Sequence, residues 1–371
     1  MRFHKGLVVA MIITLLPGCW DAREIEDRTA VVATAIDTHP EGYEVTVQIP
    51  IPMKIVGGGE GGGDGGQEAV EILSGEGSTV SDALDEIQAK SNQDVFFGNN
   101  RLILIGEEMA KKGIGQMLDS LRRNPEIRRR QWPVVVKGKA KDTLGVNTKL
   151  EQVPMEFILS MLENGIRDGL FVREGLNDLF EDLSNPAKEP VVNYITVVKD
   201  DILWSGVAVF RGDRMVGKFD RKVSRAVIHI GYGDMGEPTD ASCIKVPGEI
   251  VFAPKELKRR VKILEDGEKL RIRVQIDMRG DITERTCQID LSSDDNLAVL
   301  EKSVERVYER RARHTIRRAQ AVGSDIFNFG DIIRARHPGR WRAMDWEKEF
   351  PDVEVDVNYK VTIRRFGTEA R

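Results

Sequence analysis

The sequence is poor in the residues and motifs that most often carry catalysis. It has five histidines and three cysteines among 371 residues, and neither type is clustered. It lacks the Gly-x-Ser-x-Gly elbow, the His-Glu-x-x-His pair, the Walker loop and the Cys-x-x-Cys clip. Acidic residues are too scattered for any pair to be nominated as general acid and base. We therefore expect an interaction protein with no enzymatic activity, no cofactor and no metal site.

Charge and apolar patterning exclude two further classes. The formal net charge is -5 at pH 7, and nucleic-acid binding requires a concentrated positive field, so we expect no nucleic-acid partner. No apolar run after Leu16 approaches the about 20 residues that a membrane-spanning helix needs. The length and the hydrophobic fraction of 41% predict two or three globular domains.

The N-terminus carries an export signal that ends in a cysteine. Residues 2–5 are basic, residues 6–16 form a short apolar run, and Leu16-Pro17-Gly18 precedes Cys19. This arrangement is typical of a bacterial lipobox, in which the thiol receives a diacylglycerol and becomes the new N-terminus. We predict a signal peptide over residues 1–18, a lipidated, palmitate-bearing Cys19, and a charged tether over residues 19–28. The alternative is an ordinary signal peptide with an unrelated cysteine.

Residues 29–139 are predicted to form an N-terminal α-β domain. Apolar and polar residues alternate strictly from Tyr43 to Ile51, which is typical of a strand with one wet face. A glycine-rich loop at residues 57–66 contains Gly-x-Gly-x-x-Gly, but the next helix begins only near Thr79, so we expect no phosphate to bind there.

A basic cluster lies before the strand predicted at residues 132–137. It consists of Arg122, Arg123, Arg128, Arg129 and Arg130. We interpret it as a solvated face balanced by Glu107, Glu108 and Glu126, with an anionic headgroup partner as the alternative.

Residues 140–200 are predicted to form a helical section or a second α-β domain, and residues 201–371 a C-terminal α-β domain. Apolar runs flanking turns predict hairpins over residues 204–219 and 257–278. Residues 226–230 are predicted to form a strand that runs into a second Gly-x-Gly-x-x-Gly at residues 231–236. No helical pattern follows this motif, so it too fails as a phosphate site.

The strongest periodicity lies near the C-terminus. Residues 297–322 predict a long helix with one apolar stripe and a crowd of arginines, and residues 353–363 alternate as a strand. We expect the helix to pack across antiparallel strands. The predicted fold class is therefore α+β, with several domains, mixed and antiparallel sheets and packed helices.

Two cysteines remain once Cys19 is assigned to lipidation. Cys243 and Cys287 could form a disulfide in an exported protein, or stay as two partly buried thiols, and their spacing does not decide between these states.

Several local motifs together resemble one known family. They are Gly18-Cys19-Trp20-Asp21, Arg23-Glu24-Ile25, the segments 100–107 and 206–217, and near the C-terminus Asp325-Ile326-Phe327-Asn328-Phe329-Gly330 with Pro338, Trp341, Trp346, Phe350-Pro351 and the strand ending Ile363-Arg364-Arg365. With these motifs the chain resembles, nearly end to end, the Ger(x)C family, the lipoprotein C subunits of spore germinant receptors. Residues 222–226 and the long glycine loop depart from the family pattern.

The resemblance implies three α-β domains held by lipid at the outer face of the spore inner membrane. It implies a complex with two integral-membrane subunits, A and B, and a role in starting germination when a nutrient is sensed. Of the family's functional residues, only the lipidated cysteine transfers, to Cys19.

Two alternatives stay open. A solute-binding lipoprotein of a transport system would call for alternating β-α units and a cleft between two lobes, whereas this sequence favours hairpins. Phe327, Phe329, Trp341 and Trp346 could form an interface, but we predict that most of them are core residues, since aromatic side chains supply much of a domain's buried area.

Overall fold

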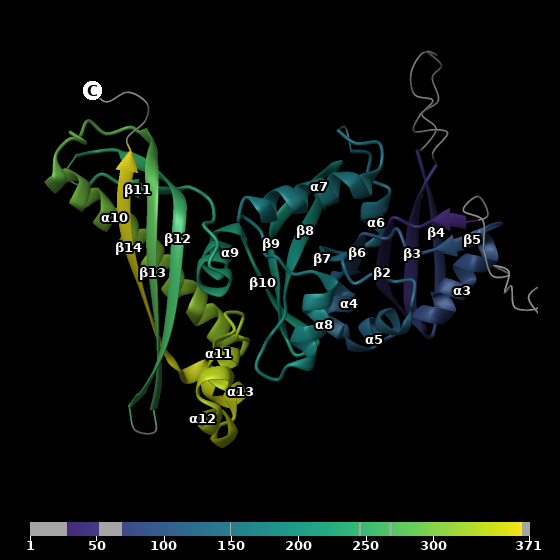
Figure 1. Cartoon of the computed structure of the whole chain (residues 1–371). Coiled ribbons are helices and arrows are strands. Elements are labelled where there is room, and N and C mark those ends of the chain that lie inside the picture. The colour runs from purple at the N-terminus through teal and green to yellow at the C-terminus, as the bar shows by residue number, and fades with distance from the viewer. Residues whose placement is uncertain (1–27, 52–68, 149, 245, 267–268, 366–371) are drawn as a thin grey trace, which may run out of the picture.

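The computed structural model describes residues 28–51, 69–148, 150–244, 246–266 and 269–365 (Figure 1). Its larger part is an eight-stranded sheet in the order β10-β9-β8-β7-β6-β2-β3-β4. The strands are β2 (Ala33–His39), β3 (Gly42–Pro50), β4 (Val70–Gly77), β6 (Leu102–Gly106), β7 (Trp132–Val136), β8 (Val191–Val198), β9 (Asp201–Arg211) and β10 (Arg214–Phe219). The four central strands pair in parallel and the outer strands are antiparallel.

The central strands β6 and β7 are apolar without interruption because both faces of the sheet are covered. On one face lie α3 (Val80–Lys90), α4 (Glu107–Lys112), α5 (Gly115–Arg123) and α8 (Leu176–Ser184). The other face is covered by α6 (Lys141–Leu144) and α7 (Pro154–Arg167). In β6, Ile103 and Ile105 join the first core while Leu102 and Leu104 join the second, as the two-residue period of a strand requires.

A second, four-stranded sheet has the order β11-β12-β13-β14. Its strands are β11 (Thr239–Ser242), β12 (Glu249–Asp266), β13 (Lys269–Arg285) and β14 (Glu354–Arg365). The long helix α10 (Asp294–Ala321) lies along this sheet and buries Leu300, Val304, Tyr308, Ala312 and Ile316 (Figure 1). The α+β class and the helix packed on a sheet are confirmed, although β14 pairs in parallel with β13.

Short elements complete the chain. β1 (Arg28–Ala30) pairs in parallel with β5 (Asp94–Phe96). The remaining helices are α9 (Arg221–Val227), the π-helical turn η2 (Ile228–Tyr232), α11 (Phe329–Arg336), α12 (Pro338–Ala343), α13 (Trp346–Glu349) and the 3-10 turn η3 (Phe350–Asp352).

The strand expected at residues 226–230 is wrong, because this segment is helical. Asp220 caps α9, since its carboxylate accepts from the backbone N–H of Lys222 (3.0 Å) and of Val223 (3.1 Å). The helix then continues as η2 through Ile228 and Ile230. A short apolar run that is buried on all sides fits a helix as well as a strand, so the sequence pattern alone could not distinguish the two.

The eight-stranded sheet contains strands from all three segments proposed as domains. Strands β2, β3, β4, β6 and β7 come from residues 29–139, β8 from residues 140–200, and β9 and β10 from residues 201–371. The helices of residues 140–200 cover both faces of this sheet. The division into three domains stays a prediction.

The two sheets meet at β9 and β10. Val207 and Val209 of β9 and Phe219 of β10 share one apolar core with α9, α10 and the second sheet. Polar bonds cross the same junction: Tyr232 Oη donates to Glu174 Oε1 (2.7 Å), and Ser324 Oγ donates to the carbonyl oxygen of Phe210.

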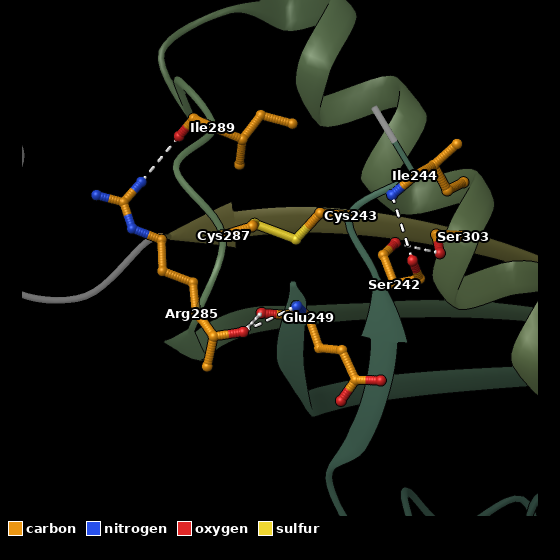
Figure 2. The surroundings of a disulfide bond; sticks show 9 residues. Ser242, Cys243, Ile244, Glu249, Arg285, Cys287, Ile289 and Ser303 are labelled. Carbon is orange, nitrogen blue, oxygen red and sulfur yellow. Dashed lines mark hydrogen bonds between the residues drawn. A yellow bond between two sulfur atoms is a disulfide. The ribbon is translucent and has the colours of Figure 1, made fainter. Parts of the chain in front are cut away.

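A disulfide joins Cys243, just after β11, to Cys287, just after β13 (Figure 2). Both residues are buried. The backbone N–H of Cys243 donates to the carbonyl oxygen of Gly248 (3.0 Å), which holds the segment after β11 against the start of β12. The pairing that the sequence left open is therefore present in the structure.

Removal of this disulfide is expected to destabilise the C-terminal sheet. The bond closes a loop across a sequence separation of 44 residues. Its loss in a Cys243→Ser/Cys287→Ser double variant should lower the free energy of unfolding by about 2 to 4 kcal/mol, because the unfolded chain regains the entropy of an open loop. Urea denaturation measures the change. A reductant should move the wild-type midpoint to that of the variant and leave the variant unchanged; a wild-type midpoint insensitive to confirmed reduction would contradict the prediction.

Glu174 gives the junction a pH dependence. Burial, and then the nearby charge of Asp182, raise the pKa of Glu174 to about 8, although Tyr232 donates a hydrogen bond to its carboxyl group; Asp178 adds to the rise and Lys188 opposes it. Because the folded chain holds this proton more tightly than the unfolded chain, the stabilisation is complete below the unfolded pKa and is lost as pH rises through about 8.

Wild-type stability should consequently fall by about 3 kcal/mol between pH 6 and pH 9 relative to a Glu174→Gln variant, whose amide mimics the protonated acid. Denaturation curves across this pH range measure the difference. Glu181→Gln, on the exposed face of α8, is the matched control and should follow the wild type. Parallel wild-type and Glu174→Gln profiles would show that Glu174 is not protonated in the folded chain.

Candidate functional site: the anchored end and the C-terminal motif

Cys19, the predicted lipidation residue, lies outside the described residues, as do the predicted signal peptide, residues 19–27 of the tether and the glycine loop at residues 57–66. The described chain begins at Arg28 in β1. The backbone N–H of Val31 donates to the carbonyl oxygen of Phe96 (2.9 Å), and the Arg28 guanidinium lies 4.8 Å from the centre of the Phe96 ring. The chain then enters β2, so the tether would join the body directly at the eight-stranded sheet.

Within the residues that the structure describes, no helix has both the length and the apolar character needed to cross a membrane. The same residues contain no group of three or more His, Cys, Asp or Glu side chains arranged to hold a metal ion.

The C-terminal motif, residues 325–330, forms the turn between α10 and α11. Asp325 is buried at its centre, and its carboxylate accepts from the backbone N–H of Gly330 (2.7 Å) and of Phe327 (3.3 Å) and from Trp346 Nε1 (3.0 Å). Burial raises the pKa of Asp325 to about 6, although these hydrogen bonds favour the charged form. One carboxylate thus fixes the turn and holds α13 against it.

A residue just before the motif, Gln320, holds the segment that leads into the last strand. Gln320 Nε2, at the end of α10, donates to the carbonyl oxygens of Phe350 (3.1 Å) and Val353 (2.7 Å), just before β14. A Cβ at Gly330 would lie 2.5 Å from Trp346 Nε1, so only glycine leaves room for the indole. The motif therefore joins α11 and α13, and Gln320 of α10 holds the segment that leads into β14.

The four aromatic residues proposed as core or interface mostly belong to the core. Phe327 and Phe329 are fully buried, with ring centres 5.3 Å apart, and Trp346 is 6% exposed. Trp341 is half-buried and packs against the same core. The prediction that most are core residues is confirmed.

The second glycine motif, residues 231–236, packs around a buried histidine. His229 Nε2 lies 2.9 Å from the carbonyl oxygen of Met235 and Nδ1 lies 3.2 Å from Tyr359 Oη, so Nε2 carries the proton and Nδ1 accepts from the tyrosine. Burial lowers the pKa of His229 to about 4 and keeps it neutral. A Cβ at Gly236 would lie 2.6 Å from His229 Nε2. Gly236 therefore serves close packing against a histidine with a structural role.

In the comparison with known proteins, two family models match consecutive parts of the chain. Residues 21–197 match the model of the spore germination protein N-terminal domain, and residues 205–367 match that of the spore germination B3/GerAC-like C-terminal domain. The break between the two models falls near the proposed boundary at residue 201, whereas the sheet continues across it through β9 and β10.

Relatives of similar length align with nearly the whole chain. The putative spore germination protein YfkR of Bacillus subtilis is 28% identical, with 98% of this chain and 97% of the relative aligned. Spore germination protein KC of Bacillus subtilis is 27% identical (98% and 95%), and GerQC of Bacillus cereus is 23% identical (98% and 99%). These relatives support a role in spore germination.

The crystal structure of the GerBC protein has the same fold. Its TM-score is 0.59 at 17% identity, and the superposition covers 88% of this chain and 96% of that one. Since the two family models together span nearly the entire described chain, and relatives named as spore germination proteins align over nearly their full length, the chain belongs to the GerAC-like family of spore germination proteins.

Proposed function

We propose that this chain is the lipid-anchored, non-enzymatic C subunit of a nutrient germinant receptor, held at the outer face of the spore inner membrane beside integral-membrane A and B subunits. The observation that carries the proposal is the end-to-end similarity to spore germination proteins in a chain whose sequence has a lipobox at Cys19. No catalytic constellation competes with a binding role in the described part of the chain.

The anchor has a simple physical basis. One acyl chain gives only marginal membrane binding, whereas the two chains of a diacylglycerol give lasting attachment, because each buried methylene contributes about 0.8 kcal/mol. A tether over residues 19–28 can reach at most about 35 Å when fully extended. The eight-stranded sheet would then stay next to the membrane, where it can contact membrane-embedded subunits.

A Cys19→Ala change should release the protein from the spore membrane fraction and slow nutrient germination to the rate of spores that lack the chain. Immunoblots of membrane and soluble fractions, with optical-density loss after nutrient addition, measure the two effects. A Cys19→Ala chain with a foreign membrane-spanning helix in place of residues 1–18 should recover both membrane attachment and germination, because the proposal requires attachment and not the lipid itself.

Unchanged germination of spores that lack the chain and all its paralogues would contradict the receptor role. A Cys19→Ala protein that stayed in the membrane fraction would contradict the anchor alone. Affinity purification from detergent-solubilised spore membranes should recover two integral-membrane proteins with the wild-type chain; recovery of an ATP-driven transporter instead would favour the solute-binding lipoprotein.

A further inference from the structure

A cleft of about 770 Å³ opens at the amino-terminal ends of the parallel strands β2, β6 and β7. Val32, Arg101 and Gln131, the residues that precede these three strands, all line it. Its volume is within the range of about 300 to 1,000 Å³ found for small-molecule sites in proteins. Because most of the residues that line it are polar or charged, it can hold a polar ligand.

Two buried amides in the lining have unused hydrogen-bonding capacity. Asn100 is 3% exposed and Gln131 is 1% exposed, and Asn100 Nδ2 donates to Gln131 Oε1 (3.2 Å). Asn100 Oδ1 and Gln131 Nε2 are buried and have no partner among the described residues. Exchanging oxygen and nitrogen in both amides would still leave one free acceptor and one free donor. Leaving such groups unsatisfied costs free energy, which a bound ligand would recover.

Backbone hydrogen bonds position the two residues. The N–H of Asn100 donates to the carbonyl oxygen of Phe97 (3.0 Å), and the carbonyl oxygen of Gln131 accepts from the N–H of Leu176 (2.8 Å) at the start of α8. These bonds fix the two backbones, whereas Asn100 Oδ1 and Gln131 Nε2 are closed to solvent in the free protein, so the side-chain amides must turn toward the cleft to meet a ligand.

Three exposed arginines, Arg128, Arg129 and Arg130, line the same cleft. In the described part of the chain, none of the three has a carboxylate within ion-pair distance. Two of the acidic residues expected to balance them are engaged elsewhere: Glu107 pairs with Lys111 (2.9 Å), and Glu126 accepts from the N–H of Phe97 (3.4 Å). Arg101 is paired with Glu163 (2.7 Å). Glu156 and Asp178 also line the cleft, so its four arginines face three carboxylates, and the lining keeps an excess of one positive charge.

We propose that this cleft binds a small organic phosphate that also carries hydroxyl groups. Guanidinium groups match the geometry of phosphate oxygens, and three of them without an ion-pair partner offer more N–H donors than the two oxygens of a carboxylate accept, whereas a phosphate monoester presents three terminal oxygens. A hydroxyl group both donates and accepts, so it satisfies the free acceptor and the free donor of Asn100 and Gln131. The site goes beyond the proposed function and does not depend on it.

A ligand of this chemistry can come from two sources. It can be a free polyol phosphate, or it can be the glycerol phosphate headgroup of an anionic lipid. Val32 lies only a few residues after Arg28, where the described chain begins, so a membrane source is within geometric reach if Cys19 is the anchor. The experiment must separate the two.

The test uses the full lipidated chain in phosphatidylcholine nanodiscs, titrated calorimetrically with glycerol 3-phosphate. We expect saturable binding tighter than about 10 mM, and at least about tenfold tighter than that of glycerol or inorganic phosphate, since each of these lacks one of the two recognised groups. An Arg128→Gln/Arg129→Gln/Arg130→Gln variant should bind at least about tenfold more weakly.

Two controls separate this site from general charge attraction. Arg306→Gln/Arg310→Gln/Arg317→Gln makes the same charge change on the exposed face of α10 and should leave the affinity unchanged. Gln131→Met removes the buried amide, so it should abolish the preference for glycerol 3-phosphate over inorganic phosphate while phosphate itself still binds. Its melting temperature shows whether it stays folded, and a moderate fall is expected because Asn100 Nδ2 loses its acceptor, Gln131 Oε1.

Nanodiscs that contain phosphatidylglycerol identify the source. If the headgroup occupies the cleft, it competes with glycerol 3-phosphate. The apparent affinity for glycerol 3-phosphate should then be lower in these discs than in phosphatidylcholine discs for the wild type and the α10 control, and equal in both discs for the variant at residues 128–130. If the ligand is a free solute, the affinity should be equal in both discs. Either result supports the site. Absence of saturable binding in both discs, or equal weakening in the residue 128–130 variant and the α10 control, would overturn it.

Discussion

The structure depends on one strand that belongs to two cores. Along β9, Val207 and Val209 face the core shared with α9, α10 and the second sheet, whereas Ala208 and Phe210 face the core beneath α4, α5 and α8. The two-residue period of a strand makes this division possible without any linker. Because both cores lose apolar contacts if β9 moves, the two sheets are expected to behave as one stiff body rather than as hinged domains.

This shared strand explains which parts of the fold the sequence could predict. The stripe of α10 and the alternation of β14 are strong local signals, and both elements were located to within a few residues. Local patterns could not show that β8, β9 and β10 extend the first sheet, because strand pairing is decided by distant partners. The same limit left the Cys243–Cys287 pairing open. It also explains why residues 226–230 were predicted as a strand, since a short apolar run fits a helix as well as a strand.

The same distinction applies to the functional residues: some are predicted by neighbouring residues in the sequence, and others are brought together only by the fold. Cys19 is predicted by contiguous residues, so it needs no knowledge of the fold. The cleft is the opposite case: Asn100 and Gln131 are 31 positions apart and meet only because β6 and β7 pair in parallel, with Leu102 opposite Trp132. The arginine cluster was visible in the sequence, but the sequence could not show that Arg123 pairs with Asp119 (2.8 Å) while Arg128, Arg129 and Arg130 line the cleft. Register and burial, which the sequence does not display, turn these scattered residues into a site.

Both sheets close part of an open edge with charged side chains from a helix. On β14, the N–H groups of Val361 and Ile363 donate to Glu305 (3.0 Å) and Glu301 (2.8 Å) of α10. On β4, the N–H of Glu76 donates to Glu86 of α3, and Lys90 donates to the carbonyl oxygen of Ser74 (2.6 Å). An uncovered edge invites pairing with another chain, and a lipid anchor would raise the local concentration of such chains in two dimensions. At these capped positions a partner cannot add a strand and must recognise side-chain surfaces. The helices and the exposed hairpin faces are therefore the surfaces to test as a subunit interface.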